Sequence, residues 1–378
     1  MRYRLERDKI GELQLPAEAY YGIHTGRSKE TFALTKHGLN RQMIKALSNI
    51  KKTAAKTNLQ MGLLDKKVAE AIILSCDEIL NGRLHGQFIT DLIQGGSGVS
   101  MNMNANEVLA NRANEMLGGK KGIYDLVHPT KDVNLNQSSA EVVLLAGKMT
   151  SIKLIKKFLT EAKKLSNSYG TVISKMKFQR DDQFSLTNEF KAFKNSLDRD
   201  IKRIDKSLEY FHEINIGSSY FETHKRVDVN YIKTFIKNLN EHLGENFVQA
   251  KEIIDNSRNL DCFVIASSAL RNLVINLSKS SFDMRKMIDD GKISIPPIHE
   301  VGVSGETNPV VLEMVNQISF YIMGNDITIA RSVEAGEYEK NIYLPMIFAC
   351  LFEIINLSRR TIRTLRERVI EGIVIIEK

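Results

Sequence analysis

Residues 130–295 contain no proline, and this feature restricts the fold of the chain more than any other. The whole sequence of 378 residues has only six prolines, and the proline-free stretch holds five of the 23 glycines. Proline breaks the interior of a helix and glycine weakens it, so their scarcity over such a length favours long helices. A β-sandwich needs turn residues about every 8–12 positions, which this stretch does not supply. We therefore expect a mainly α fold.

Apolar residues recur at steps of three and four along most of the chain, which predicts amphipathic helices. The clearest stripe runs from Leu145 to Leu165. Residues 1–36 are expected to be irregular, with short strands near 4–6 and 12–15. Long helices with narrow apolar stripes pack into bundles, often with other subunits. The expected helices cover residues 40–80, 105–118, 145–165, 185–211, 228–243, 246–290 with a break near Asn256, 309–333 and 343–371.

Composition and charge exclude several classes of protein. No apolar run approaches 18 residues and the N-terminus has no signal-like region, so we expect a cytoplasmic protein without a membrane partner. The three scattered cysteines have no metal-like spacing, and we expect neither a metal nor another cofactor. The formal charge of +8 comes mostly from lysines interleaved with acids, as on a solvated surface. An arginine cluster at Arg359–Arg368 leaves nucleic-acid binding as a weakly supported alternative.

Three polar loops stand where a purely structural helical protein has no need of them, at residues 94–107, 134–141 and 298–310. Glycines let backbone N–H groups approach an anion, and amide or hydroxyl side chains at the start of a helix orient it. Each loop alone is equally well explained as a turn that leads into a helix. Their order along one chain is more informative than any single loop.

In that order and spacing, the chain resembles the aspartase/fumarase superfamily, and aspartate ammonia-lyases most closely. The resemblance runs from residue 3 to about 372. It implies a lyase domain at residues 1–139, a central helical bundle at 140–372, and the absence of the superfamily's third, C-terminal domain. The residues that carry it are Ala19-Tyr20-Tyr21-Gly22, Gln94-Gly95-Gly96, Asn102-Met103-Asn104-Ala105-Asn106-Glu107, Asn308-Pro309-Val310 and Glu334-Ala335-Gly336.

The resemblance also implies an assembly and a reaction. Members form homotetramers around a bundle of long helices, and each active site combines loops from three subunits. They remove ammonia or water from a succinyl-type compound to give fumarate. A serine of the third loop takes the proton, a lysine and an asparagine hold the substrate carboxylate, and hydroxyl groups of the first two loops complete the site.

Transferred to this chain, the superfamily positions carry several unexpected residues. Glu300 stands at the position of the serine base, and Glu306 at that of the lysine that holds the carboxylate. Lys177 falls, in a less certain register, on the position of a histidine or glutamine. Ala140 replaces a substrate-binding asparagine. The resemblance assigns substrate contacts to Arg27, Ser100, Asn102, Ser138, Ser139, Glu306 and Asn308.

These replacements weigh against the ancestral reaction. Changing a site lysine to glutamate turns an attraction for a carboxylate into a repulsion, each about 4 kcal/mol at ~4 Å and an effective dielectric near ~20. Each lost transition-state donor typically costs about 10²–10³ in rate.

Two hypotheses follow. In the first, the chain is a lyase-fold pseudoenzyme or interaction subunit that assembles with itself or with an intact paralogue. In the second, it is an active lyase for an altered succinyl-type carboxylate, with Glu300 as the base.

Overall fold

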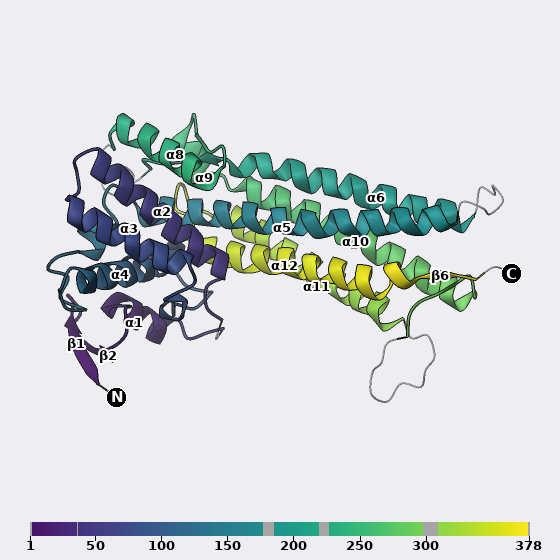
Figure 1. Ribbon diagram of the computed structural model, residues 1–378, viewed down its shortest axis with the longest axis horizontal. Coiled ribbons are helices and arrows are strands. Elements are labelled where there is room, and N and C mark those ends of the chain that lie inside the picture. Colours follow the sequence, from purple (N-terminus) through teal and green to yellow (C-terminus); the bar gives the residue numbers. More distant parts are fainter. Residues whose placement is uncertain (1, 36, 177–184, 219–226, 298–308, 377–378) are drawn as a thin grey trace. The chain divides into compact units, whose positions relative to one another are not determined.

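The structure is a computed structural model, which describes residues 2–35, 37–176, 185–218, 227–297 and 309–376. It is mainly helical, as the sequence predicts (Figure 1). Its helices are α1 (Ile23–Thr31), α2 (Arg41–Gln60), α3 (Lys66–Leu80), α4 (Val99–Met116), α5 (Ser139–Lys175), α6 (Leu186–Ser207), α8 (Val229–Leu243), α9 (Ile253–Arg258), α10 (Asp261–Asp289), α11 (Val310–Glu334) and α12 (Leu344–Arg368).

Three small two-stranded sheets accompany the helices. Strands β1 (Tyr3–Arg7) and β2 (Glu12–Pro16) form an antiparallel hairpin at the two places where the sequence predicts strands. Parallel pairing joins β3 (Glu213–Ile214) and β4 (Val248–Gln249). The third sheet pairs β5 (Ile293–Ser294) with β6 (Val374–Ile375), antiparallel.

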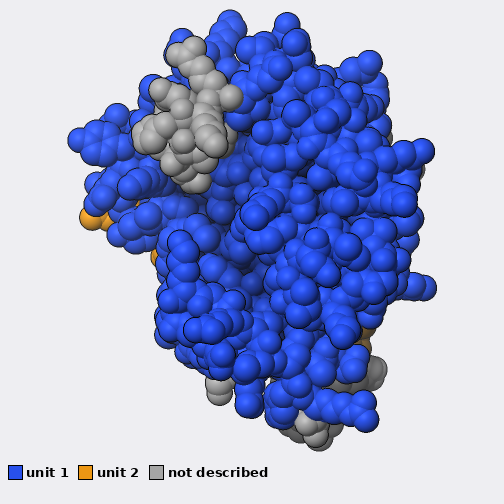
Figure 2. All heavy atoms as spheres, turned by 90° about the vertical axis from the view of Figure 1, so that its left-hand side faces the viewer, with its two compact units in different colours: residues 1–151, 210–260, 332–349 blue, residues 152–209, 261–331, 350–378 orange. Residues whose placement is uncertain are grey.

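The chain divides into two compact units, each assembled from separate stretches of sequence (Figure 2). Unit 1 comprises residues 1–151, 210–260 and 332–349, and unit 2 comprises 152–209, 261–331 and 350–378. Helices α5, α11 and α12 contribute residues to both units. All the described residues of the first two polar loops belong to unit 1.

Unit 2 is a bundle built from α6, α10, most of α11 and the later turns of α5 and α12. Tyr169 of α5 meets Phe190 of α6 edge-on, with ring centroids 6.3 Å apart. The carboxylate of Asp326 in α11 accepts hydrogen bonds from Ser267 and Arg271 of α10. The first contact joins two helices that the proline-free stretch predicts, and the second joins α10 to α11. In the described part of the chain, no helix has both the length and the apolar character needed to cross a membrane.

The predicted helix at 40–80 is two helices, α2 and α3, in unit 1. Gly62 lies between them with φ +69, a left-handed conformation that glycine adopts without strain. The Asp65 side chain then caps α3 by accepting hydrogen bonds from the backbone of Lys67 and Val68. Apolar spacing continues across the break, which is why periodicity alone predicts one helix.

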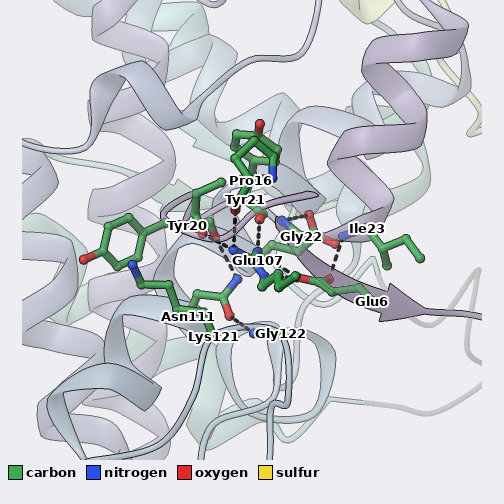
Figure 3. Close-up of polar contacts among 12 residues, drawn as sticks. Glu6, Pro16, Tyr20, Tyr21, Gly22, Ile23, Glu107, Asn111, Lys121 and Gly122 are labelled. Carbon is green, nitrogen blue, oxygen red and sulfur yellow. Dashed lines mark hydrogen bonds and ion pairs between the residues drawn. The ribbon is translucent and has the colours of Figure 1, made fainter. Parts of the chain in front are cut away.

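Helix α1 lies within a region that the sequence predicts to be irregular. The Glu107 carboxylate, which comes from α4, accepts a hydrogen bond from the backbone N–H group of Gly22, directly before α1 (Figure 3). It also accepts hydrogen bonds from the backbone N–H groups of His24 and Thr25, in the first turn of α1. It also accepts one from the Thr25 hydroxyl at 2.6 Å. A carboxylate at a helix N-terminus accepts hydrogen bonds from otherwise unpaired N–H groups. Its negative charge also interacts favourably with the positive end of the helix dipole. The stabilising contact is distant in sequence, so local pattern misses this helix.

Two helix starts also differ from the prediction. Helix α4 begins at Val99 rather than near 105, directly after Gly98, whose φ is +81. A Cβ at Gly98 would lie only 2.8 Å from the Val143 side chain, so the turn requires glycine. The predicted helix at 246–290 starts only at Ile253, because β4 pairs with β3, and its predicted break is confirmed between α9 and α10.

Candidate functional site

The first two polar loops meet in unit 1. The Nδ2 group of Asn102, in the first turn of α4, donates a 2.8 Å hydrogen bond to Oγ of Ser139, the first residue of α5. Residues 94–107 and 134–141 therefore lie against each other in unit 1. The Oδ1 atom of Asn102 is buried and has no hydrogen-bond partner among the described residues.

Asn134 organises the inside of this site. Its Oδ1 atom accepts hydrogen bonds from Nζ of Lys51 at 2.6 Å, Nδ2 of Asn102 at 3.2 Å and Nδ2 of Asn106 at 3.3 Å. Its own Nδ2 group donates to the carbonyl of Gln137, which shapes the turn before α5. One amide thus connects α2, α4 and the second loop.

Ser138 is the N-cap of α5. Its carbonyl accepts from Val142 N–H, and its Oγ accepts from the N–H of Glu141 at 3.2 Å. The buried Glu141 carboxylate contacts a different segment of the chain. It accepts hydrogen bonds from Gly217 N–H and from the Ser218 hydroxyl, both at 3.2 Å. The start of α5 is thereby tied to the segment that follows β3.

A cavity of about 140 Å³ opens beside Ser138, and we call it the Ser138 pocket. This volume equals that of about five liquid waters at ~30 Å³ each, and it is smaller than the ~300–1,000 Å³ typical of drug-sized ligands. The pocket therefore suits a small metabolite. It is lined by Ser97, Ser138, Ala140, Leu144, Asn215, Ser218, Ser257, Glu339, Lys340, Asn341 and Leu344.

Most polar groups of the pocket hold one another in place. Asn215 donates to the Ser257 hydroxyl at 2.8 Å, and Asn341 donates to the Ser257 carbonyl. The Oδ1 atom of Asn341 is buried and has no hydrogen-bond partner in the described ranges. Lys340 is exposed and Glu339 half-buried, which places one cation and one anion among the lining residues.

Sequence reasoning missed the part of the pocket that comes from residues 215–218, 257 and 339–341. One signal was present: Gly217 is one of the few glycines of the helical middle, and its φ of +93 shows that it marks a turn. The Asn215-to-Ser218 sequence around it is polar, like the loops that were recognised. No comparable signal distinguishes Ser257, since only its place in the fold brings it to the pocket.

The remaining described residues that the resemblance assigns to substrate have other surroundings. Arg27 forms a two-point ion pair with Asp8, at 2.8 and 2.9 Å, and also donates to the carbonyl of Gly11. This pair lowers the pKa of the Asp8 carboxyl to about 2. Ser100 is buried in the first turn of α4. Neither Arg27 nor Ser100 lines the Ser138 pocket.

Several predicted residues lie outside the described part of the chain: Lys177, Glu300, Glu306 and Asn308. Within the described ranges, no group of three or more histidine, cysteine or acidic residues is placed to hold a metal.

The arginine cluster near the end of α12 is partly neutralised within unit 2. Arg366 pairs with Glu161, Glu367 and Glu371, and Arg363 pairs with Glu367. Ion pairs of this kind weaken the case for a nucleic-acid surface there.

Comparison with known proteins gives a consistent result. Residues 11–324 match a family described as Lyase. The chain is 36% identical to an aspartate ammonia-lyase of Bacillus subtilis, in an alignment that covers all of this chain and 82% of the relative. An aspartate ammonia-lyase of Helicobacter pylori is 33% identical over 99% of this chain and 84% of its own length.

Solved structures agree with the sequence matches. A fumarate lyase:delta crystallin from Brucella melitensis superposes with a TM-score of 0.91 at 31% identity. The match covers 99% of this chain and 89% of that one.

Proposed function

The chain belongs to the lyase family of the aspartase/fumarase superfamily, and from this membership we propose a diverged, ligand-binding role for it. It binds a small amino or hydroxy acid in the Ser138 pocket but has lost the elimination of ammonia from aspartate and of water from malate. It acts as a lyase-fold pseudoenzyme within an oligomer. The observation that carries this proposal is the charge balance of the Ser138 pocket.

The pocket offers the groups that a zwitterion with one carboxylate needs. The Lys340 ammonium, which forms no ion pair within the described residues, attracts a carboxylate. Glu339 attracts an ammonium group, and the unpartnered Oδ1 of Asn341 accepts one of its hydrogens. A second carboxylate would find no further cation among the described lining residues, and Ala140 supplies no hydrogen-bond donor. A dicarboxylate is therefore a poor ligand.

The sequence supports the same conclusion. Glu300 and Glu306 stand where the superfamily has a serine base and a lysine that holds the carboxylate. Each acidic group near a bound carboxylate adds a repulsion of about 4 kcal/mol at ~4 Å and an effective dielectric near ~20. Binding of aspartate or malate is weakened before any catalytic step begins.

A second candidate is an active lyase that acts on a less acidic succinyl-type substrate. The hydrogen bond between Asn102 and Ser139 favours it, because it keeps in order two polar loops that carry amide and hydroxyl groups. In this alternative Glu300 is the base, and Lys177 takes the place of the superfamily's histidine or glutamine. The aspartate ammonia-lyases named above are relatives of the chain and give this alternative its chemistry.

The first experiment follows the ultraviolet absorbance of fumarate while the purified protein is incubated with L-aspartate or L-malate. We expect no rise above the protein-free blank. A clear rise with either substrate would contradict the loss of the ancestral reaction.

The second experiment separates the two candidates. The protein is screened by thermal shift against L-asparagine, L-serine and succinamate, and any stabilising compound is tested for turnover. Stabilisation without turnover supports the pseudoenzyme. Turnover that disappears in Glu300→Gln but persists in the exposed control Glu70→Gln supports the active lyase.

A homotetramer is part of the same proposal. Helix α11 exposes Phe320, Tyr321 and Ile327, large apolar side chains at steps that place them along one side of the helix. Light scattering on the purified protein is expected to give about four times the 42.8 kDa chain mass; a single-chain mass would contradict the assembly. Co-purification with an intact paralogue tests mixed oligomers. The three cysteines are buried thiols, which favours a cytoplasmic location.

A further inference from the structure

Lys51, which donates a hydrogen bond to Asn134, is completely buried in α2. None of its surface is exposed, which is rare for lysine because water solvates the ammonium group strongly. Among the described residues, the single hydrogen bond of its Nζ atom goes to Oδ1 of Asn134, at 2.6 Å. A buried cation with so few partners costs stability and requires an explanation other than packing.

The atom that Lys51 contacts is the centre of the site. Oδ1 of Asn134 also accepts hydrogen bonds from the side-chain amides of Asn102 and Asn106. Asn102 donates its other amide hydrogen to the Ser139 hydroxyl. A positive charge on Lys51 draws electron density to Oδ1 and fixes the orientation of the Asn134 amide, since only the oxygen end can face it. The opposite amide end then points to the Gln137 carbonyl, which it contacts at 3.0 Å.

The orientation of Asn134 reaches the pocket in two ways. Through Asn102 it sets the position of Ser139. Through Gln137 it sets the turn that immediately precedes Ser138, the cap of α5 and a wall of the pocket. The buried charge is thus connected to both serines of the second loop through hydrogen bonds.

We propose that Lys51 is a positioning residue of this site, which in its charged form holds Asn134 and, through Asn102 and Gln137, the loop that presents Ser138 and Ser139. When the loop loosens, the ammonium group loses its acceptor on Asn134 but stays buried in α2, so the charged form favours the ordered loop and loss of the charge loosens it. Global unfolding differs, because it exposes Lys51 to water. The inference rests on the proposed function only in so far as it concerns the same pocket, because order in the loop exists with or without a ligand.

The surroundings of Lys51 allow its charge to change near neutral pH. Burial lowers the pKa of its ammonium group to about 7, against the opposing effects of Cys76 in α3 and Glu141 in α5. Burial also raises the pKa of the Cys76 thiol, which therefore stays neutral near pH 7. The neighbouring Lys52 and Asp77 form an ion pair with each other, at 2.6 Å. Glu141 is then the acidic group whose charge favours the ammonium form of Lys51. The loop is expected to tighten below about pH 7 and to loosen above it.

Amide hydrogen exchange of the full-length protein tests the proposal without any ligand. Protection of residues 134–141 is measured over a pH series and corrected for intrinsic exchange rates, in wild type and in Lys51→Met. Wild-type protection is expected to fall about tenfold as the pH rises through about 7. A tenfold change corresponds to a difference of about one unit between the pKa of Lys51 in the ordered loop and in the loosened loop. In Lys51→Met the protection is expected to be low at every pH, with no step.

Lys52→Met is the matched control, because it removes an adjacent lysine whose ion pair with Asp77 is partly exposed. Its loop protection is expected to match wild type. Asn134→Asp is a second variant, which gives Lys51 an anionic partner and keeps it charged, so protection is expected to persist to higher pH. This variant still tests the proposal if Lys51→Met does not fold.

Wild-type protection that does not change with pH, or unchanged protection in Lys51→Met at about pH 6, would overturn the proposal. Failure of the proposed function is a separate result. It would appear as the absence of any thermal shift with L-asparagine, while the exchange pattern of residues 134–141 still follows Lys51.

Discussion

The 2.8 Å hydrogen bond from Nδ2 of Asn102 to Oγ of Ser139 joins the first turn of α4 to the first turn of α5. The two residues are 37 positions apart, and each belongs to a polar loop recognised in the sequence. Because Asn102 is wholly buried, this bond is made away from solvent, where an unpaired amide would be costly. This hydrogen bond holds the two loops against each other.

A double-mutant cycle measures this contact. We expect Asn102→Ala and Ser139→Ala each to lower the free energy of unfolding, with a coupling energy of about 0.5–1.5 kcal/mol between them. Urea denaturation of wild type, both single variants and the double variant gives the value. Additive effects would mean that the two side chains stabilise the fold independently.

Replacing Lys51 with methionine is expected to change the dependence of stability on pH. The pKa of Lys51 is about 7 in the folded protein and near ~10.5 in the unfolded chain, so between these values the unfolded state binds more protons. Wild-type stability therefore rises with pH across this window, and the full penalty is present below about pH 7. Methionine has no charge to bury and removes that penalty.

The free energy of unfolding of Lys51→Met is thus expected to exceed that of wild type by a few kcal/mol near pH 6. The difference should shrink as the pH approaches ~10. Denaturant titrations at several pH values test this, with Lys52→Met as the control. A gap between Lys51→Met and wild type that stays constant with pH would show that Lys51 does not titrate in this range.

Glu107→Gln is expected to destabilise α1. The Glu107 carboxylate accepts four hydrogen bonds from Gly22, His24 and Thr25, and an uncharged amide cannot accept from all four donors. Leaving a buried donor unpaired costs about 1–3 kcal/mol. Denaturant unfolding gives the loss, and exchange of residues 23–31 locates it.

The exposed variant Glu70→Gln is the control for this change and should stay within about 0.5 kcal/mol of wild type. If Glu107→Gln behaved in the same way, the contacts in Figure 3 would not be what holds α1 in place.

The parts of the fold that depend on local pattern could be predicted, whereas those that depend on distant partners could not. The proline-free stretch predicted the long helices α5 and α10, because helix length is limited by breakers within the segment itself. Helix α1 was missed because its N-terminus is satisfied by Glu107, more than 80 residues away. Periodicity also failed at Gly62, where a turn separates two helices without interrupting the apolar spacing.

The candidate site shows the same division. Ser138 and Asn102 were found because glycine, amide and hydroxyl residues cluster in their loops. Lys51 gave no signal, since a lysine in an amphipathic helix is normally solvated and nothing in the sequence marks this one as buried. Asn341 and Ser257 reach the pocket only through tertiary packing. The roles of Glu300, Glu306, Lys177 and Asn308 remain predictions.

Filling the Ser138 pocket tests where a ligand binds. Ala140 lines the pocket at the start of α5, and Ala140→Leu adds three carbon atoms to a cavity of about 140 Å³. Leucine is a good helix former and the added volume enters existing space, so the unfolding free energy should change by less than about 1.5 kcal/mol. Stabilisation by L-asparagine in a thermal-shift assay, however, is expected to be lost.

Ala335→Leu, at an exposed position, should keep the wild-type shift. Should Ala140→Leu respond to the ligand as wild type does, the ligand binds elsewhere and the charge balance of this pocket does not determine what the protein recognises.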